Sequence, residues 1–244
     1  MHSQVFSAFE HIVIDGGSKD GSIKVLERYE KEYNLSWISE PDNGIADAMN
    51  KGVKLSTGDY ILFIHADDLL HSSYTLQKVY EDIKQSDCLI YSFQVEHNGI
   101  GNRSKVMNPP RLLWWNRFRN NIPHQGVFVH KDIFRGVGLF DTTYSICMDY
   151  DFFYRAFNSG ATVKKINRIV SRMGGRGISS NHEMDKTRLK EGFKIQIKNE
   201  KNNMWKILQI IFSLIYFPYK LLLIPIFRND RDAVKMVFSG RSGK

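Results

Sequence analysis

The feature that most constrains the fold is the segment 59–68, whose sequence is DYILFIHADD. Its apolar part is rich in β-branched and aromatic residues, which predicts a strand buried on both faces, as in a parallel sheet. Open α/β sheets bind ligands just beyond the carboxyl ends of their strands, so Asp67 and Asp68 lie where a ligand is expected. A divalent cation or a solvated loop would relieve the repulsion between these adjacent acids. The alternative is a helix N-cap with an acidic first turn.

The charge balance of the chain favours an anionic partner. Its 244 residues include 34 Lys and Arg against 26 Asp and Glu, a formal net charge of +8. Nucleotide phosphates, nucleic acid and an acidic membrane surface all fit such a balance. The basic residues are scattered and no recognised nucleic-acid motif is present, so we expect no nucleic-acid partner. Cys88 and Cys147 are too few for a disulfide framework, which makes a reducing compartment the default.

Strand and helix patterns alternate along the first 66 residues. Strands are predicted at 9–15, 35–40 and 59–66, with helices between them at about 22–33 and 45–55. Short links between such elements predict a doubly wound α/β sheet with right-handed crossovers. Further strands are predicted at 88–93, 127–129 and 163–166, with helices at about 74–85 and from Asp132 and Met148.

The C-terminal part of the chain has a different character. Residues 205–227 are almost all Trp, Ile, Leu, Phe and Tyr, enough for a membrane span of about 20 residues. Pro218, Lys220 and Pro225 argue against a straight span, and the aromatics with flanking basic residues favour an interfacial or re-entrant element. The alternative is a helix pair packed on the domain. We therefore predict a domain at 1–200 and a hydrophobic, basic, membrane-associating segment at 201–244.

Short motifs occur in a fixed order across residues 9–180. They are IDGGSKDG at 14–21, SEPDNGIADAMNKG at 39–52, TGD at 57–59, HADD at 65–68, HQ at 124–125 and MDYD at 148–151. The ordered set resembles the family 2 glycosyltransferases of the GT-A fold, in particular the branch that builds bacterial surface polysaccharides. The resemblance implies a mixed, mostly parallel sheet, followed here by the C-terminal hydrophobic helical appendage.

The function implied by the resemblance is sugar transfer in surface polysaccharide synthesis. The donor is expected to be a nucleotide-diphosphate sugar, the acceptor a lipid-linked glycan, and the stereochemistry inverting. A divalent metal, Mn²⁺ or Mg²⁺, is expected as cofactor, because the leaving diphosphate carries charge that needs neutralising. A lipid-linked acceptor would place the protein at a membrane surface, on the cytoplasmic side of the inner membrane.

The resemblance also implies roles for individual residues on the donor side. Asp68 matches the metal-side carboxylate and Asp67 the contact to ribose or metal, while Asp15 would reach the nucleotide base. The matching positions in the donor-binding turn and helix are Gly44, Asp47 and Asn50. His65 stands where many relatives carry Asp or Asn, so the acid cluster here has two carboxylates rather than three.

On the acceptor side, an inverting reaction needs a base that deprotonates the attacking hydroxyl. Asp149 matches that position best and Asp151 second; for both, the alternative is a solvated charge in the first turn of a helix. His124 and Gln125 would border the acceptor, although a single histidine after a proline is as often structural.

The chain departs from the family pattern at its N-terminus. Family members have a strand and a helix before the segment that matches Phe9, whereas eight residues precede it here. The alternative function is therefore a truncated, catalytically inactive remnant that binds only a nucleotide or a partner.

Overall fold

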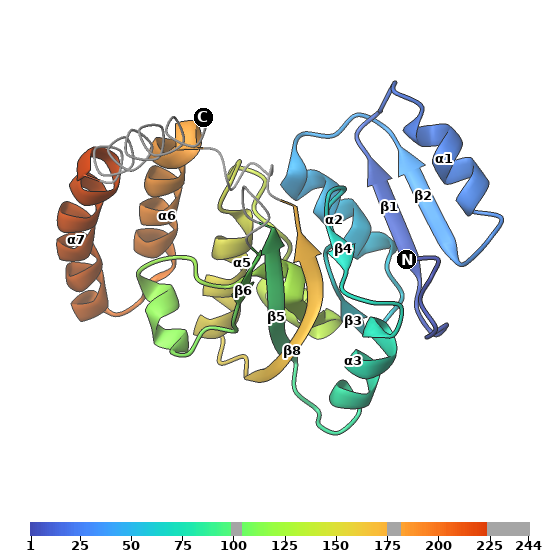
Figure 1. Cartoon of the computed structure of the whole chain (residues 1–244). Coiled ribbons are helices and arrows are strands. Elements are labelled where there is room, and N and C mark those ends of the chain that lie inside the picture. Colours follow the sequence, from blue (N-terminus) through green and yellow to red (C-terminus); the bar gives the residue numbers. More distant parts are fainter. Residues whose placement is uncertain (99–103, 175–181, 224–244) are drawn as a thin grey trace, which may run out of the picture.

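The computed structural model describes residues 1–98, 104–174 and 182–223 (Figure 1). Its N-terminal part consists of β1 (His11–Asp15), α1 (Ser22–Tyr29), β2 (Leu35–Ser39) and α2 (Ile45–Leu55). Strands β1 and β2 pair in parallel, with His11 opposite Leu35 and Asp15 opposite Ser39. The strand–helix–strand order predicted for this region is confirmed, and it brings the polar ends of β1 and β2 together.

The larger sheet contains β3 (Tyr60–Ile61), β4 (Leu69–Leu70), β5 (Ile90–Asn98), β6 (Ser104–Met107), β7 (Val127–His130) and β8 (Val163–Met173). Its order is β3-β7-β5-β8-β4, with β6 paired to β5. Strands β5 and β8 are parallel, whereas β3–β7, β5–β7, β5–β6 and β4–β8 are antiparallel. The α/β class and the mixed sheet are confirmed, but the prediction of mostly parallel pairing is corrected. Parallel neighbours need a crossover, and β7 instead returns beside β5 without an intervening α-helix.

The segment predicted as a strand buried on both faces differs from that expectation. Ladder pairing covers only Tyr60 and Ile61, which lie opposite His130 and Val129 of β7. Residues 60–64 are half-buried, and residues 62–66 of this segment belong to no strand. A single neighbouring strand covers one edge of this segment, so its burial falls short of that of a central strand.

Helices cover the sheet and build its core. They are α3 (Thr75–Ile83), α4 (Lys131–Val137) and α5 (Met148–Asn158), with short 3₁₀ turns at Leu113–Arg117, His124–Gly126 and His182–Met184. Helix α5 is central, because eight of its 11 residues are buried, among them Phe152 and Tyr154. Phe152 stacks on Phe134 of α4 at a ring-centroid distance of 4.5 Å. This aromatic packing fixes the N-terminus of α5, where the predicted base lies.

Two further helices, α6 (Asp185–Asn199) and α7 (Asn203–Pro218), form the side of the molecule opposite β1 and β2 (Figure 1). Helix α7 continues into a π-helical turn, Tyr219–Leu223. The predicted C-terminal helical segment is thus confirmed to residue 223, and residues 224–244 lie outside the described residues. The division at about residue 200 stays a prediction.

Candidate active site

The two acids of the opening segment lie in a turn at one end of the sheet. The Asp68 backbone N–H donates to the carbonyl of His65 at 3.0 Å. The Asp68 carboxylate accepts two backbone N–H groups, from His65 at 3.2 Å and from Gly174 at 3.1 Å. Asp68 is buried and Asp67 is exposed. Leu69 and Leu70 form β4 rather than a helix, so the helix N-cap alternative for these acids is wrong.

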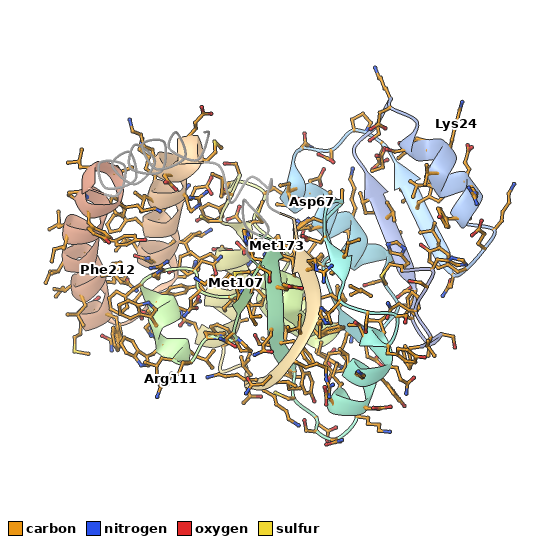
Figure 2. The ribbon with its side chains drawn as sticks, in the orientation of Figure 1. Lys24, Asp67, Met107, Arg111, Met173 and Phe212 are labelled. Carbon is orange, nitrogen blue, oxygen red and sulfur yellow. The ribbon has the colours of Figure 1, made fainter. Side chains whose placement is uncertain are left out.

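Gly174 closes this turn from the end of β8. A Cβ at position 174 would overlap the Asp67 carboxylate, so any other residue there would displace the Asp67 side chain from its position in the turn. Asp67 and Met173, the residue before Gly174, lie at the same end of the central sheet (Figure 2). Gly174 was not predicted as a site residue, although the glycine cluster at 174–177 was a signal for it; residues 175–177 lie outside the described part.

A chain of side-chain contacts joins the acid turn to α5. The Nε2 atoms of His65 and His124 are 2.8 Å apart, and His124 Nδ1 is 3.1 Å from Asp149 Oδ2. The two imidazole rings meet edge to face at a centroid distance of 5.1 Å. The sequence offered His124 as an acceptor-side residue and His65 only as a substitution in the acid motif. The structure brings both into one line with Asp149.

The environment of Asp149 keeps its carboxylate ionised. Burial by itself raises the pKa, but hydrogen bonds from His124, from Asn120 at 3.0 Å and from the Tyr150 N–H at 2.7 Å outweigh it and hold the pKa of Asp149 below its usual value. Burial, followed by the proximity of His124, lowers the pKa of His65. An ionised carboxylate is the state that a general base requires.

Asp151 lies in a different environment from Asp149. It is fully buried, and its carboxylate accepts hydrogen bonds from Arg155 Nε at 2.8 Å and Asn199 Nδ2 at 2.9 Å. Arg155 also donates to the carbonyls of Val137 and Leu139. These contacts hold α5 against α6 and the turn after α4. They indicate a structural role for Asp151, and the catalytic role implied by the resemblance stays a prediction.

On the donor side, Asp15 ends β1 with a full set of hydrogen bonds. Its carboxylate accepts from the Ser18 hydroxyl, the Ser39 hydroxyl at 2.7 Å and the N–H groups of Ser18 and Gly17. These hydrogen bonds, with that from the Ser18 hydroxyl the largest, lower the pKa of Asp15 to about 2. The carboxylate therefore shapes the glycine-rich turn after β1, and a contact to a base stays a prediction.

The predicted residues of the donor-binding turn and helix are arranged around the N-terminus of α2. Gly44 precedes the helix with φ 103°, a conformation that favours glycine. Asp47 Oδ2 accepts the N–H of Asn43 at 3.1 Å and lies 3.7 Å from Lys51 Nζ. Asn50 is buried and exchanges two hydrogen bonds of 2.9 Å with the backbone of Phe140. Gly44 and Asp47 thus border the turn, whereas Asn50 joins α2 to the loop before α5.

The turn containing His124 and Gln125 is pressed against the sheet. A Cβ on Gly126 would lie 2.9 Å from the carbonyl oxygen of Phe93. Any residue other than glycine at position 126 would therefore force this turn away from β5. Gln125 is buried and its carbonyl accepts the Ser171 hydroxyl at 2.8 Å. This packing fixes His124 next to Asp149. The acceptor-side role of His124 and Gln125 stays a prediction.

The acid turn has the chemistry of a partial metal site. No group of three or more His, Cys, Asp or Glu side chains that could hold a metal is found among residues 1–98, 104–174 and 182–223. Mg²⁺ and similar hard cations are, however, commonly held by one or two carboxylates together with water and substrate phosphates. Asp68 and Asp67 present two adjacent carboxylates, and each Asp68 oxygen keeps a lone pair beyond its backbone hydrogen bond. The residues present therefore fit an ion completed by a diphosphate.

Two solved structures share the fold of this chain. The Staphylococcus aureus protein TarS, residues 1–349 in complex with UDP-GlcNAc, superposes with a TM-score of 0.65 at 14% identity over 90% of this chain and 67% of that one. The mannosyltransferase PcManGT of Pyrobaculum calidifontis, in complex with GDP-Man and Mn²⁺, gives a TM-score of 0.59 at 15% identity over 100% and 70% of the two chains. These similarities show that the chain has the GT-A fold.

Sequence comparison identifies the family. A PGL/p-HBAD biosynthesis glycosyltransferase of Mycobacterium bovis is 31% identical over 171 residues, 68% of this chain and 65% of that protein. The putative glycosyltransferase EpsH of Bacillus subtilis is 28% identical over 102 residues, 41% of this chain and 30% of that protein. The chain thus spans about two thirds or less of the length of these relatives. The profile described as Glycosyl transferase family 2 matches residues 2–157. The chain belongs to glycosyltransferase family 2.

Proposed function

We propose that the protein transfers a sugar from a nucleotide-diphosphate sugar to a hydroxyl of a glycan acceptor, with inversion at the anomeric carbon. The observation that supports this most is the convergence of Asp68 and Asp149, which lie far apart in the sequence and are joined through His65 and His124. One acid sits in the turn that fits a cation and the other is a buried, ionised carboxylate. A transferase of this class needs both within one site.

The donor half of the proposal rests on the acid turn and on the ligands of the structural neighbours. TarS and PcManGT were solved with UDP-GlcNAc and with GDP-Man and Mn²⁺. In this chain Asp68, with Asp67, would hold a Mn²⁺ or Mg²⁺ ion. Such an ion would supply neutralisation of the charge that develops on the leaving diphosphate.

The acceptor half assigns Asp149 as the base. As the acceptor oxygen forms its bond to the anomeric carbon and the bond from that carbon to the diphosphate oxygen breaks, Asp149 takes the hydroxyl proton. Attack on the face opposite the diphosphate inverts the configuration. Asp149 Oδ1 accepts one hydrogen bond among the described residues, from the Tyr150 N–H, and so has a lone pair left for a hydroxyl.

Titration of the full chain with nucleotide sugars tests the proposal. Calorimetry with UDP- and GDP-sugars in the presence of Mn²⁺ is expected to show binding that a chelator abolishes, and slow donor hydrolysis should release the nucleoside diphosphate. Nucleotide binding without hydrolysis or transfer to any acceptor would favour the alternative of a catalytically inactive remnant. Absence of any binding would contradict the donor class.

We further propose that α7 holds the protein on a membrane surface at the cytoplasmic side of the inner membrane, where a lipid-linked acceptor is available. Helix α7 differs from a helix of a soluble domain because its outward face is apolar as well. Its inner face carries buried Gln209 and Ser213, and Gln209 donates to the Arg117 carbonyl at 3.0 Å and the Tyr154 hydroxyl at 2.8 Å. Its outer face is apolar and exposed, and this face continues into the π-helical turn that follows. The residues are Met204, Ile207, Leu208, Ile210, Ile211, Leu214 and Ile215 in α7, and Tyr219 and Leu222 in the turn.

Neighbouring features fit the same surface. The ring centroids of exposed Trp114 and of Trp205, near the start of α7, are 6.3 Å apart. The guanidinium carbon of Arg119 lies 5.7 Å from the centroid of the Tyr216 ring. Aromatic and basic side chains bordering an apolar face are typical of membrane interfaces. The stretch Asn203–Leu222 is long and apolar enough to cross a membrane by length and composition, and 11% of its most apolar window is buried. The glutamine contacts of its inner face favour a helix that lies on the surface.

Charge placed on the outer face of α7 should release the protein from vesicles. Leu214→Glu with Ile215→Glu is expected to weaken binding to anionic liposomes at least about tenfold, because each buried apolar side chain contributes about 1.5–3 kcal/mol. Val25→Glu, at an exposed apolar position on α1, is the matched control and should float like the wild type. Equal flotation of all three chains would contradict the proposal, and a concentration-dependent dimer lost in the α7 variant would assign the face to a second copy instead.

A further inference from the structure

His65 connects the two halves of the site, and we propose that it is a positioning residue for Asp149 that acts through His124. This inference rests on the proposed function, since it concerns the orientation of the base in that reaction. The contacts that carry it are the 2.8 Å approach of the two Nε2 atoms and the 3.1 Å contact between His124 Nδ1 and Asp149 Oδ2.

The direction of each hydrogen bond follows from the chemistry of the groups. An ionised carboxylate only accepts, so His124 Nδ1 must carry a hydrogen to bond Asp149. When His124 carries only this one ring hydrogen, its other nitrogen is an acceptor, and His124 Nε2 then accepts from His65. In this arrangement, which the proposal assigns, His65 is the Nε2–H tautomer and donates to His124. This donor locks His124 in the one tautomer that can hold Asp149.

The hydrogen-bond pattern on Asp149 shows what this control achieves. Oδ2 accepts from both His124 and Asn120, which occupies both of its lone pairs, whereas Oδ1 accepts only the Tyr150 N–H among the described contacts. A fixed His124 therefore leaves Oδ1 as the oxygen that can receive a proton from a hydroxyl. If His124 rotated or changed tautomer, Asp149 would lose a donor and its orientation.

The backbone of His65 extends the link to the acid turn. Its N–H donates to the Asp68 carboxylate at 3.2 Å, and its carbonyl accepts the Asp68 N–H at 3.0 Å. The same residue thus holds the cation-side carboxylate through its main chain and the base through its imidazole. A shift of the acid turn on donor binding would reach Asp149 through the His65 backbone and two consecutive side-chain contacts.

Substitutions that remove or restore the donor separate positioning from general structure. His65→Met, which has no donor, is expected to lower kcat about five- to tenfold with the KM for the donor unchanged. His65→Gln places an amide N–H near the position of Nε2 and should restore most of the loss. His124→Asn keeps an N–H toward Asp149 but ends the link to His65, so adding His65→Met to it should have no further effect. A full, independent effect of His65→Met in the His124→Asn background would overturn the proposal.

A spectroscopic measurement tests the inference without any turnover. Long-range ¹H–¹⁵N correlation of the imidazoles in the full chain should show His65 as the Nε2–H tautomer and His124 as the Nδ1–H tautomer. His65→Met should move His124 toward a mixture of tautomers, whereas His2→Met, at an exposed position, should not. The opposite tautomers in the wild type, or an unchanged His124 in His65→Met, would overturn the proposal. Because this measurement needs no donor or acceptor, failure of the proposed function would leave it intact.

Discussion

Asp149→Asn is expected to lower kcat about a hundredfold or more while leaving the affinity for the donor unchanged, the usual scale of an acid–base contribution. The amide has nearly the same volume as the carboxylate but cannot take the hydroxyl proton. In the wild type both oxygens of the Asp149 carboxylate accept hydrogen bonds, from His124, Asn120 and the Tyr150 N–H. The NH₂ group of the asparagine will therefore face at least one of these donors. Steady-state kinetics with donor calorimetry separates lost chemistry from lost binding, and thermal unfolding monitors the folded state.

Asp151→Asn is the matched control two residues along the same helix. Its carboxylate is enclosed between Arg155 and Asn199, and breaking a buried ion pair costs about 3 kcal/mol or more of the free energy of unfolding. We therefore expect a lower Tm with kcat largely retained below the transition. Normal turnover in Asp149→Asn, together with lost turnover in a stably folded Asp151→Asn, would move the base to Asp151.

Asp68→Asn is expected to reduce transfer about a thousandfold or more, because a bound cation contributes several kcal/mol of transition-state stabilisation. The asparagine oxygen can still accept one of the two backbone N–H groups of His65 and Gly174, which limits the damage to the turn. Binding of Mn²⁺ in the presence of nucleoside diphosphate, measured by calorimetry, should be lost in parallel with activity.

The control for this change is Asp87→Asn, at an exposed acid outside the proposed site. It removes the same charge and should retain both activity and Mn²⁺ binding. Full activity of Asp68→Asn, or of the wild type in the presence of a chelator, would contradict metal dependence and return Asp68 to a role in closing the turn with Gly174.

Local patterns along the chain predicted most of the elements and the family. The helix at 45–55 and the alternation of strands and helices up to residue 55 were confirmed, because each helix depends mainly on contacts between residues close in sequence. The ordered motifs likewise predicted the GT-A fold, which the structural neighbours show. The short pairing of β3 and the antiparallel direction of β7 were not predicted, since strand partners are set by distant segments.

The candidate site shows the same division between local and long-range information. Asp67 and Asp68 could be chosen from the sequence because acids at a strand end are a local signal, and Asp149 was chosen because the motif at 148–151 matches the position of the base in the family that the chain resembles. The link from His65 through His124 to Asp149 could not, because it joins residues of three separate segments that meet only after β7 and α5 have packed on the sheet. The resemblance ranked Asp149 before Asp151, although both lie in one helical turn and carry the same local signal. Only the tertiary structure shows that the Asp151 carboxylate is held by Arg155 and by Asn199 of α6, which supports that order.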